Sequence, residues 1–346
     1  MKKHKNIPIF IPHEGCPNQC VFCNQRSISG VMRFDPTTVD AQIKEALSTI
    51  SEDTECEIAF FGGSFTGIDR ELMIYLLSVA YEYVKAGRVA SVRCSTRPDY
   101  IDEEILDILW KYGVRTIELG LQSTSDSVLK ASGRGHSFAD EERAVKLITE
   151  RGFSLVGQMM IGLPHSTYLD EIRTAEFIAQ SGATAARIYP TVVFRDTPLC
   201  EMTQQGKYKP LDEEDAIRRS LGAFIMLNAC GVDVIRIGLS ASENLSGEAY
   251  YAGPNHPALG ELVINELYYD KIKLECILLF RTVRRRGVIL KVSVSPGSVS
   301  RAVGQRRKNI NRLTEEFDFS KICVVEDEAL SEFDVSVSVE GENRCI

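Results

Sequence analysis

The 346-residue chain has no apolar run that approaches the roughly 18 residues a membrane-spanning helix needs. It also has no secretory h-region behind its Lys-rich start, so we expect a cytoplasmic protein whose ten cysteines form no disulfide framework. Seven of the cysteines show no ligand-like pairing, and we expect most of these to be small buried hydrophobic residues. They are Cys56, Cys94, Cys200, Cys230, Cys276, Cys323 and Cys345.

Acidic residues are missing from 281–312, a stretch that holds ten Lys and Arg. The whole chain carries a formal charge of -8, so the rest of it is strongly acidic. A segregated basic block in an acidic protein indicates an anionic partner, and we expect nucleic acid, with a solvated surface as the alternative. The candidate RNA-binding residues are Arg301, Arg306, Arg307, Lys308 and Arg312.

Composition and length predict a globular protein with one large and one smaller domain, because 44% of the residues are hydrophobic and 25% are charged. We place the first domain at 1–240 and the second at 241–346.

In the first domain, β-rich runs alternate with helical patterns, which predicts an α/β fold. Six alternating strands imply parallel structure with helices outside and a site at the carboxyl ends of the strands. We expect the strands near 7–12, 57–63, 90–96, 116–122, 153–161 and 184–189, and the helices near 37–50, 69–85, 101–112, 138–151 and 168–180. A helix near 213–229 and a strand near 234–238 follow.

The second domain is predicted to be a small αβ appendage. We expect helices near 261–284 and 299–317, and strands near 288–294, 322–326 and 333–339. Gly304 begins a sequence, Gly304-Gln305-Arg306-Arg307, that is similar to the GxxG loop with which KH domains clamp an RNA backbone. Arg307 stands in place of the second glycine, and an appendage that only packs on the first domain is the alternative.

Three closely spaced cysteines follow the first predicted strand: Cys16, Cys20 and Cys23. Thiolates suit iron-sulfur clusters and zinc. Three of them would leave one iron of a four-iron cubane without a protein ligand, so that iron could bind a substrate or cofactor. His13 lies three residues before Cys16, and a closed Cys3His zinc site is the alternative.

Unusual residues also fall where the other predicted strands end, so we expect them to meet at one mouth. They are Gly62, Gly63, Arg97, Glu118, Gln122, Met159, Met160 and Tyr189. The alternative for Glu118 and Gln122 is that both are satisfied polar residues of the core.

The spacing Cys-x3-Cys-x2-Cys, with Phe22 before the last cysteine, resembles the signature of the radical S-adenosylmethionine (SAM) superfamily. Across about 8–240 the chain resembles the radical SAM core of the Elongator catalytic subunit. The motifs that carry this resemblance are Gly62-Gly63-Ser64-Phe65, Ser95-Thr96-Arg97-Pro98-Asp99-Tyr100, Ile117-Glu118-Leu119-Gly120-Leu121-Gln122-Ser123, Arg134-Gly135-His136-Ser137, Met159-Met160-Ile161-Gly162-Leu163-Pro164 and Tyr189-Pro190-Thr191-Val192-Val193. A zinc site explains none of them.

The resemblance implies a partial (β/α)6 radical SAM barrel in which the three cysteines hold a [4Fe-4S] cluster and SAM occupies its open iron. It implies that Gly62 and Gly63 let backbone approach the SAM amino group and that Arg97 pairs with the SAM carboxylate. It further implies that Glu118 and Gln122 accept hydrogen bonds from SAM. Phe22, Met160 and Tyr189 would frame the adenosine.

The activity implied is reductive cleavage of SAM to a 5'-deoxyadenosyl radical, with an electron donor such as flavodoxin or ferredoxin. The basic block and the Elongator-like core favour tRNA modification. The sequence resembles a short bacterial form, without the length for the acetyltransferase domain of the Elongator subunit, so we expect a different modification or a partner that handles acyl-CoA. The alternatives are a radical SAM oxidoreductase acting on a small molecule such as a porphyrinogen, and a non-catalytic iron-sulfur protein that binds RNA or a partner.

Overall fold

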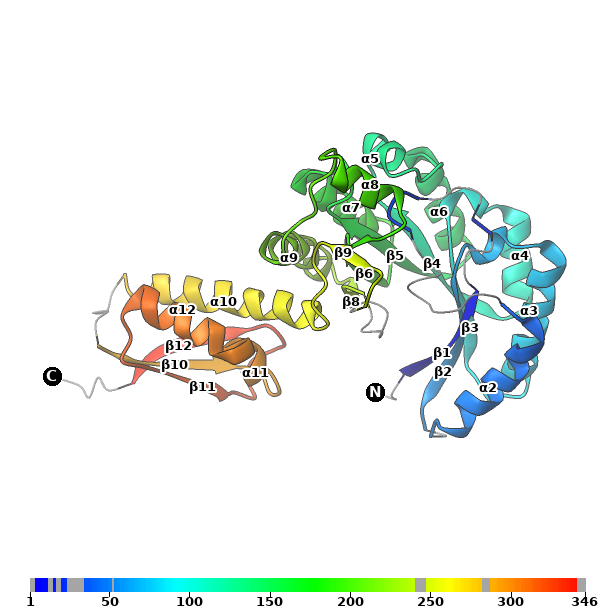
Figure 1. Ribbon diagram of the computed structural model, residues 1–346. Helices are drawn as coiled ribbons and strands as arrows, with labels where there is room; N and C mark the ends of the chain where they lie inside the picture. The colour runs from blue at the N-terminus through cyan, green and yellow to red at the C-terminus, as the bar shows by residue number, and fades with distance from the viewer. Residues whose placement is uncertain are drawn as a thin grey trace. The chain divides into compact units, whose positions relative to one another are not determined.

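The structure is a computed structural model that describes residues 4–11, 15–16, 20–23, 34–51, 53–239, 247–281 and 287–340. The chain divides into two compact units, Met1–Pro257 and Ala258–Ile346 (Figure 1). The domain boundary expected between residues 240 and 241 lies outside the described residues. Each unit is described by itself below.

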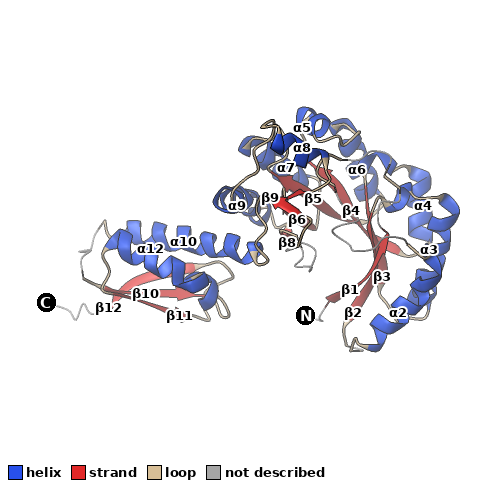
Figure 2. Cartoon of the chain, in the orientation of Figure 1, coloured by secondary structure: helices blue, strands red, loops and turns tan. Residues whose placement is uncertain are grey.

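The first unit is built on a seven-stranded, all-parallel sheet in the order β1-β2-β3-β4-β5-β6-β8. The strands are β1 (His4–Ile11), β2 (Glu55–Gly62), β3 (Ser91–Thr96), β4 (Val114–Gln122), β5 (Ser154–Ile161), β6 (Ala185–Pro190) and β8 (Asp233–Ile237). The sheet curls into a half-barrel, as the red strands of Figure 2 show. This confirms the predicted partial barrel, with the strand expected near 234–238 added to its edge as the seventh.

Helices connect the strands and cover one face of the sheet (Figure 2). They are α2 (Val39–Ser48), α3 (Arg70–Lys85), α4 (Glu103–Lys111), α5 (Asp126–Ala131), α6 (Phe138–Glu150), α7 (Tyr168–Gln180), α8 (Pro198–Gln204) and α9 (Glu213–Ala229). Both α6 and α7 begin with a capping box, in which Ser137 pairs with Asp140 and Thr167 with Asp170. These caps fix where the chain leaves each strand-end loop, and so they help to shape the mouth.

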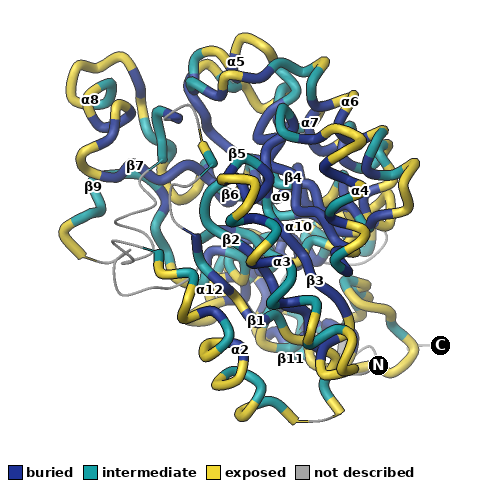
Figure 3. Tube along the Cα trace, turned by 90° about the vertical axis from the view of Figure 1, so that its right-hand side faces the viewer, coloured by how far each residue is buried: buried dark blue, intermediate teal, exposed yellow. Residues whose placement is uncertain are grey.

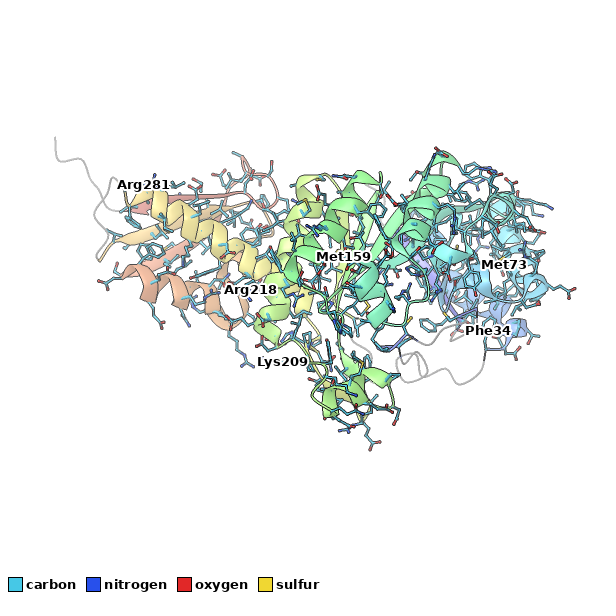
Figure 4. All side chains as sticks on the ribbon, turned by 90° about the horizontal axis from the view of Figure 1, so that it is seen from above. Phe34, Met73, Met159, Lys209, Arg218 and Arg281 are labelled. Carbon is cyan, nitrogen blue, oxygen red and sulfur yellow. The ribbon has the colours of Figure 1, made fainter. Side chains whose placement is uncertain are left out.

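The core lies between the sheet and these helices. Alternate residues of each strand point toward the helices and are fully buried, such as Phe60 on β2, Leu119 on β4 and Met159 on β5. Figure 3 shows the central strands buried, and Figure 4 labels Met159. At Gly157 an added Cβ would lie 2.7 Å from Ile178 of α7, so the helix packs directly on the strand backbone. The polar residues of the same strands therefore face the other side of the sheet.

Several short elements were not expected from the sequence. They are α5, α8 and the antiparallel pair of β7 (Val193–Phe194) and β9 (Tyr250–Ala252). Elements of two to seven residues show too little periodicity to be recognised.

The second unit consists of α10 (Leu259–Leu279), β10 (Ile289–Val294), α11 (Val299–Val303), α12 (Lys308–Phe317), β11 (Lys321–Glu326) and β12 (Val335–Glu340). β10 is the central strand, parallel to β11 and antiparallel to β12. Its core includes Tyr268 and Ile272 of α10, Val292 of β10 and Leu313 of α12.

The single helix expected at 299–317 is wrong, because the structure has two helices joined by a short 3-10 turn at Gln305–Arg307. Gly304 adopts φ +76°, and Arg306 and Arg307 adopt φ of +51° and +61°. An α-helix requires negative φ at every residue, so the chain has to break there.

Candidate functional site

The cysteine segment follows β1 and lies against the turn that follows β2. Gly15 adopts φ +75°, and a Cβ at this position would collide with the carbonyl oxygen of Ser64. The backbone N–H of Val21 donates to the Ser132 carbonyl at 3.0 Å, and the Val21 carbonyl accepts from the Leu199 N–H at 2.9 Å. Segments that are distant in the sequence therefore hold this segment in place.

Cys20 is buried, Cys23 is half-buried and Cys16 is exposed. Within the described ranges no three Cys, His, Asp or Glu side chains form a group that could hold a metal ion. His13, the fourth ligand of the zinc alternative, lies outside the described residues.

Two buried arginines lie beside the cysteines. Arg134, in the loop between α5 and α6, donates from Nη1 to the Cys20 sulfur at 3.4 Å. Arg97, at the end of β3, is clamped by Asp99, which accepts from its Nε and Nη2 at 2.9 Å each. Burial opposes the charge of Arg97, but Asp99 and the nearby cysteine sulfurs outweigh it and raise its pKa. Arg97 therefore stays charged although it is buried.

Several buried polar atoms in or near this loop have no hydrogen-bond partner among the described residues. They include Arg97 Nη1, Gln122 Oε1, Ser132 Oγ, Arg134 Nε, His136 Nδ1 and Glu141 Oε2. Nearly all buried polar groups in proteins are paired, so a cluster of unpaired ones indicates room for a polar ligand. Gln122 also adopts φ +75° where the β4–β5 register shifts, a strained conformation of the kind that concentrates at functional sites.

Gly62 and Gly63 lie at the end of β2, where the backbone passes close to Ile11 of β1. Gly62 adopts φ +116°, and an added Cβ would lie 2.5 Å from the Ile11 carbonyl oxygen. The Gly63 N–H donates to that same oxygen at 2.8 Å. The structure thus accounts for Gly62 by the close approach of β1 to β2.

Glu118 lies in the middle of a buried charge network on the inner face of the sheet. It accepts from Arg93 Nη1 at 3.0 Å, from Arg187 Nε at 2.8 Å and from Gln158 Nε2 at 2.9 Å. Arg93 also pairs with Glu57. The carboxylate oxygens of Glu118 are therefore already engaged, as in the alternative that makes it a satisfied polar residue of the core.

Met160 and Tyr189 are cross-strand neighbours on β5 and β6. Both are half-buried, and burial raises the pKa of Tyr189. Phe22 packs elsewhere, against the small apolar cluster of Val193, Leu199 and Tyr208. The structure thus places Met160 beside Tyr189 and Phe22 among residues of β7 and α8.

The basic residues of the second unit fall into two groups. Arg306, Arg307 and Lys308 are exposed in the turn before α12 and have no ion-pair partner among the described residues. In contrast, Arg312 pairs with Glu266 at 2.7 Å and stacks 3.5 Å from the ring centre of Tyr269. Arg301 faces two carboxylates, Glu261 at 3.6 Å and Glu332 at 3.4 Å. Arg281 follows the end of α10 (Figure 4).

Comparison with known proteins matches most of the first unit to known families. The Radical SAM superfamily matches residues 10–178, and the Radical_SAM C-terminal domain matches residues 183–269. The chain belongs to the radical SAM superfamily. The match covers the cysteine segment, Arg97, Arg134 and all of the strands from β2 to β8.

Relatives with known sequences include uncharacterized protein MJ0486 of Methanocaldococcus jannaschii, 31% identical over 233 residues, which are 62% of this chain and 71% of that protein. The tRNA uridine(34) acetyltransferase of the same organism is 26% identical over 313 residues, 78% of this chain. The chain spans 57% of the length of that acetyltransferase.

Among solved structures, the archaeal Methanocaldococcus infernus Elp3 with residues 1–46 deleted superposes with a TM-score of 0.61 at 22% identity. The match covers 79% of this chain and 64% of that one. The matching families, the sequence relatives and this shared fold together confirm the resemblance to the Elongator catalytic subunit. None of the described helices combines the length and apolar character that crossing a membrane requires.

The residue types at the site fit the cofactors of the radical SAM superfamily, because three thiols are a donor set that suits an iron-sulfur cluster. The described positions of Cys16, Cys20 and Cys23 do not bring the three thiols together as a ligand group. The unpartnered Arg97 Nη1 and Gln122 Oε1 offer one donor and one acceptor to an amino acid such as the methionyl part of SAM. The sequence motifs contained Arg134 and Asp99 but assigned neither a role. The contact of Arg134 with Cys20 joins residues far apart in the sequence, so it leaves no local pattern.

Replacing Glu118 by Ala should destabilise the first unit by about 3–5 kcal/mol, because it leaves Arg93 and Arg187 without their shared buried carboxylate. The matched control, Glu142→Ala on α6, removes an exposed carboxylate and should change little. Urea unfolding followed by the fluorescence of Trp110, the only tryptophan, measures the first unit. Equal midpoints for the two variants would show that the network contributes nothing.

The buried pair of His136 and Glu141, joined at 3.0 Å, predicts a pH dependence of stability. Burial lowers the pKa of His136 to about 4 and raises that of Glu141 well above its ordinary value of 4.5. The folded pair therefore keeps one proton from about pH 4 up to the raised pKa of Glu141. The unfolded pair loses its last proton near the ordinary histidine value of 6.5, so above that pH folding takes up a proton and stability falls as pH rises.

We expect the double variant His136→Gln, Glu141→Gln, which holds no titratable proton, to lose this part of the decline in unfolding free energy, which begins above pH 6.5 and ends at the raised pKa of Glu141. The loss amounts to at most about 1.4 kcal/mol per pH unit. Urea unfolding at several pH values measures it, and a slope unchanged from that of the unsubstituted protein would contradict the proton count.

Proposed function

We propose that this chain is a radical SAM enzyme in which Cys16, Cys20 and Cys23 bind a [4Fe-4S] cluster and SAM, and that its substrate is tRNA. The observation that carries the first part is the set of unpartnered polar atoms on Arg97 and Gln122 beside the cysteine segment. When bound, the cluster and SAM supply a one-electron cleavage that yields methionine and a 5'-deoxyadenosyl radical.

Arg97 is the residue that we propose for the SAM carboxylate. Asp99 fixes two of its guanidinium nitrogens, and the carbonyl of Arg134 accepts from Nη2 at 2.5 Å, so Nη1 is left in a defined direction. A guanidinium held in this way loses little entropy when it binds a carboxylate. Gln122 Oε1 is an acceptor for the SAM amino group or ribose.

Other residues have indirect roles in this proposal. Gly62 and Gly63 shape the backbone beside the ligand, and Met160 and Tyr189 offer an apolar surface for the adenosine. Phe22 holds the cysteine segment on its apolar support. For Glu118 we propose a positioning role, in which it holds Arg187 and the inner face of the sheet, in place of a direct contact with SAM.

The tRNA part rests on the exposed basic turn of the second unit and on the tRNA uridine(34) acetyltransferase among the relatives. Arg307, in the position of the second glycine of a GxxG loop, adopts the left-handed conformation that glycine favours. The loop backbone therefore supports the KH-like interpretation that the sequence alone left open. Arg306, Arg307 and Lys308 would contact phosphates, whereas Arg301 and Arg312 are held by carboxylates of their own unit.

A low-potential electron donor such as flavodoxin or ferredoxin would reduce the cluster. Cleavage can be tested by anaerobic reconstitution with iron and sulfide, then dithionite, SAM and bulk tRNA. We expect 5'-deoxyadenosine by mass spectrometry and a tRNA-dependent modified nucleoside. A Cys20→Ala variant should lose both the cluster and the cleavage.

A loaded cluster that yields no 5'-deoxyadenosine would overturn the enzymatic proposal and leave a binding protein. Cleavage with no change in any nucleoside of the added tRNA would direct the search to a small-molecule substrate.

Binding to RNA is tested separately with the triple variant Arg306→Glu, Arg307→Glu, Lys308→Glu. We expect its tRNA affinity to fall at least about tenfold and the dependence of binding on salt to weaken, because fewer counterions are released. The matched control reverses three exposed helix lysines of the first unit, Lys44, Lys111 and Lys146, and should bind more tightly than the triple variant. If the triple variant and the control bind tRNA with equal affinity in a filter-binding or fluorescence assay, the proposal that this turn binds RNA is wrong.

A further inference from the structure

Arg134 is a buried cation that pairs with no acidic side chain among the described residues, and it is 6% exposed. Its Nη2 donates to the Gly120 carbonyl at 2.6 Å, and its Nε has no partner. An isolated charge in such a place is costly unless an anion lies beside it.

Arg134 donates to the sulfur of Cys20, which is itself 6% exposed. We infer that Arg134 donates a hydrogen bond to the Cys20 thiolate and thereby raises the reduction potential of the cluster bound there. The inference rests on the proposed function, because it requires the [4Fe-4S] cluster on Cys20.

The physical reason is the change of charge on reduction. A cluster with three thiolate ligands is anionic, and one added electron makes it more so. A cation and a hydrogen bond at a ligand sulfur favour the more negative state, and the effect is large where water is excluded. The barrier to electron uptake from a weak reductant is then lowered before SAM is cleaved.

The guanidinium is held so that it keeps this position. Gly120 leaves room for it, since an added Cβ there would lie 3.3 Å from Arg134 Nη2. The Arg134 carbonyl accepts from Arg97, so the two arginines form one unit with separate tasks. Arg97 Nη1 is left for the ligand, while Arg134 Nη1 is committed to the sulfur.

The test is the midpoint potential of the reconstituted full-length protein, measured by redox titration with electron paramagnetic resonance and without SAM. Arg134→Met removes the charge and the hydrogen bond and should lower the potential. We expect about a tenfold smaller ratio of reduced to oxidised cluster at a fixed potential, which for one electron is about 59 mV. Arg134→Lys keeps the charge and should shift less. Lys130→Met, which removes an exposed cation from the adjacent α5, should match the unsubstituted protein.

A loaded Arg134→Met protein with an unshifted potential overturns the inference and leaves the proposed function intact. If that variant takes up no cluster, the inference is tested by electron paramagnetic resonance of the unsubstituted protein with ¹⁵N-labelled arginine. Its reduced cluster should show a ¹⁵N coupling that Arg134→Lys lacks, and a spectrum without that coupling overturns the inference. An unsubstituted chain that binds no [4Fe-4S] cluster overturns both proposals.

Discussion

The inner face of the half-barrel depends on a row of alternating buried charges. Glu57, Arg93, Glu118 and Arg187 are linked in sequence from β2 to β6. The helices cover the opposite face of the sheet, and the strands of a parallel sheet are normally buried on both faces. On this face the charges neutralise one another, and removal of Glu118 would leave Arg187 without its carboxylate and Arg93 with only Glu57.

This network separates two kinds of polar residue that look alike in the sequence. Charges within the sheet are fully engaged, and they fix the register of the strands and the directions of their ends. Beyond the strand ends lie Arg97, Gln122 and Arg134, each with an atom left over. In the interior of the sheet the charged groups are all paired, whereas at one end some polar atoms have no hydrogen-bond partner among the described residues. This arrangement is expected of a preorganised ligand site.

The strongly periodic parts of the fold could be predicted from the sequence, and α7 and α9 have the bounds expected at 168–180 and 213–229. The periodicity continued through Gly304, so the break before α12, which needs positive φ at consecutive residues, could not be recognised. The site was predictable as a set of strand ends. Its pairings were not, because Arg134 and Cys20 are 114 residues apart in the sequence and only the folded chain joins them.

The central claim is that three cysteines of this chain leave one iron of a cubane open to SAM. Mössbauer spectroscopy of the protein reconstituted with ⁵⁷Fe, before and after addition of SAM, tests it most directly. The account predicts four irons per cluster, one of which changes its isomer shift when SAM binds while the other three do not. A spectrum in which SAM alters no iron, or a protein that binds only zinc, would contradict the account.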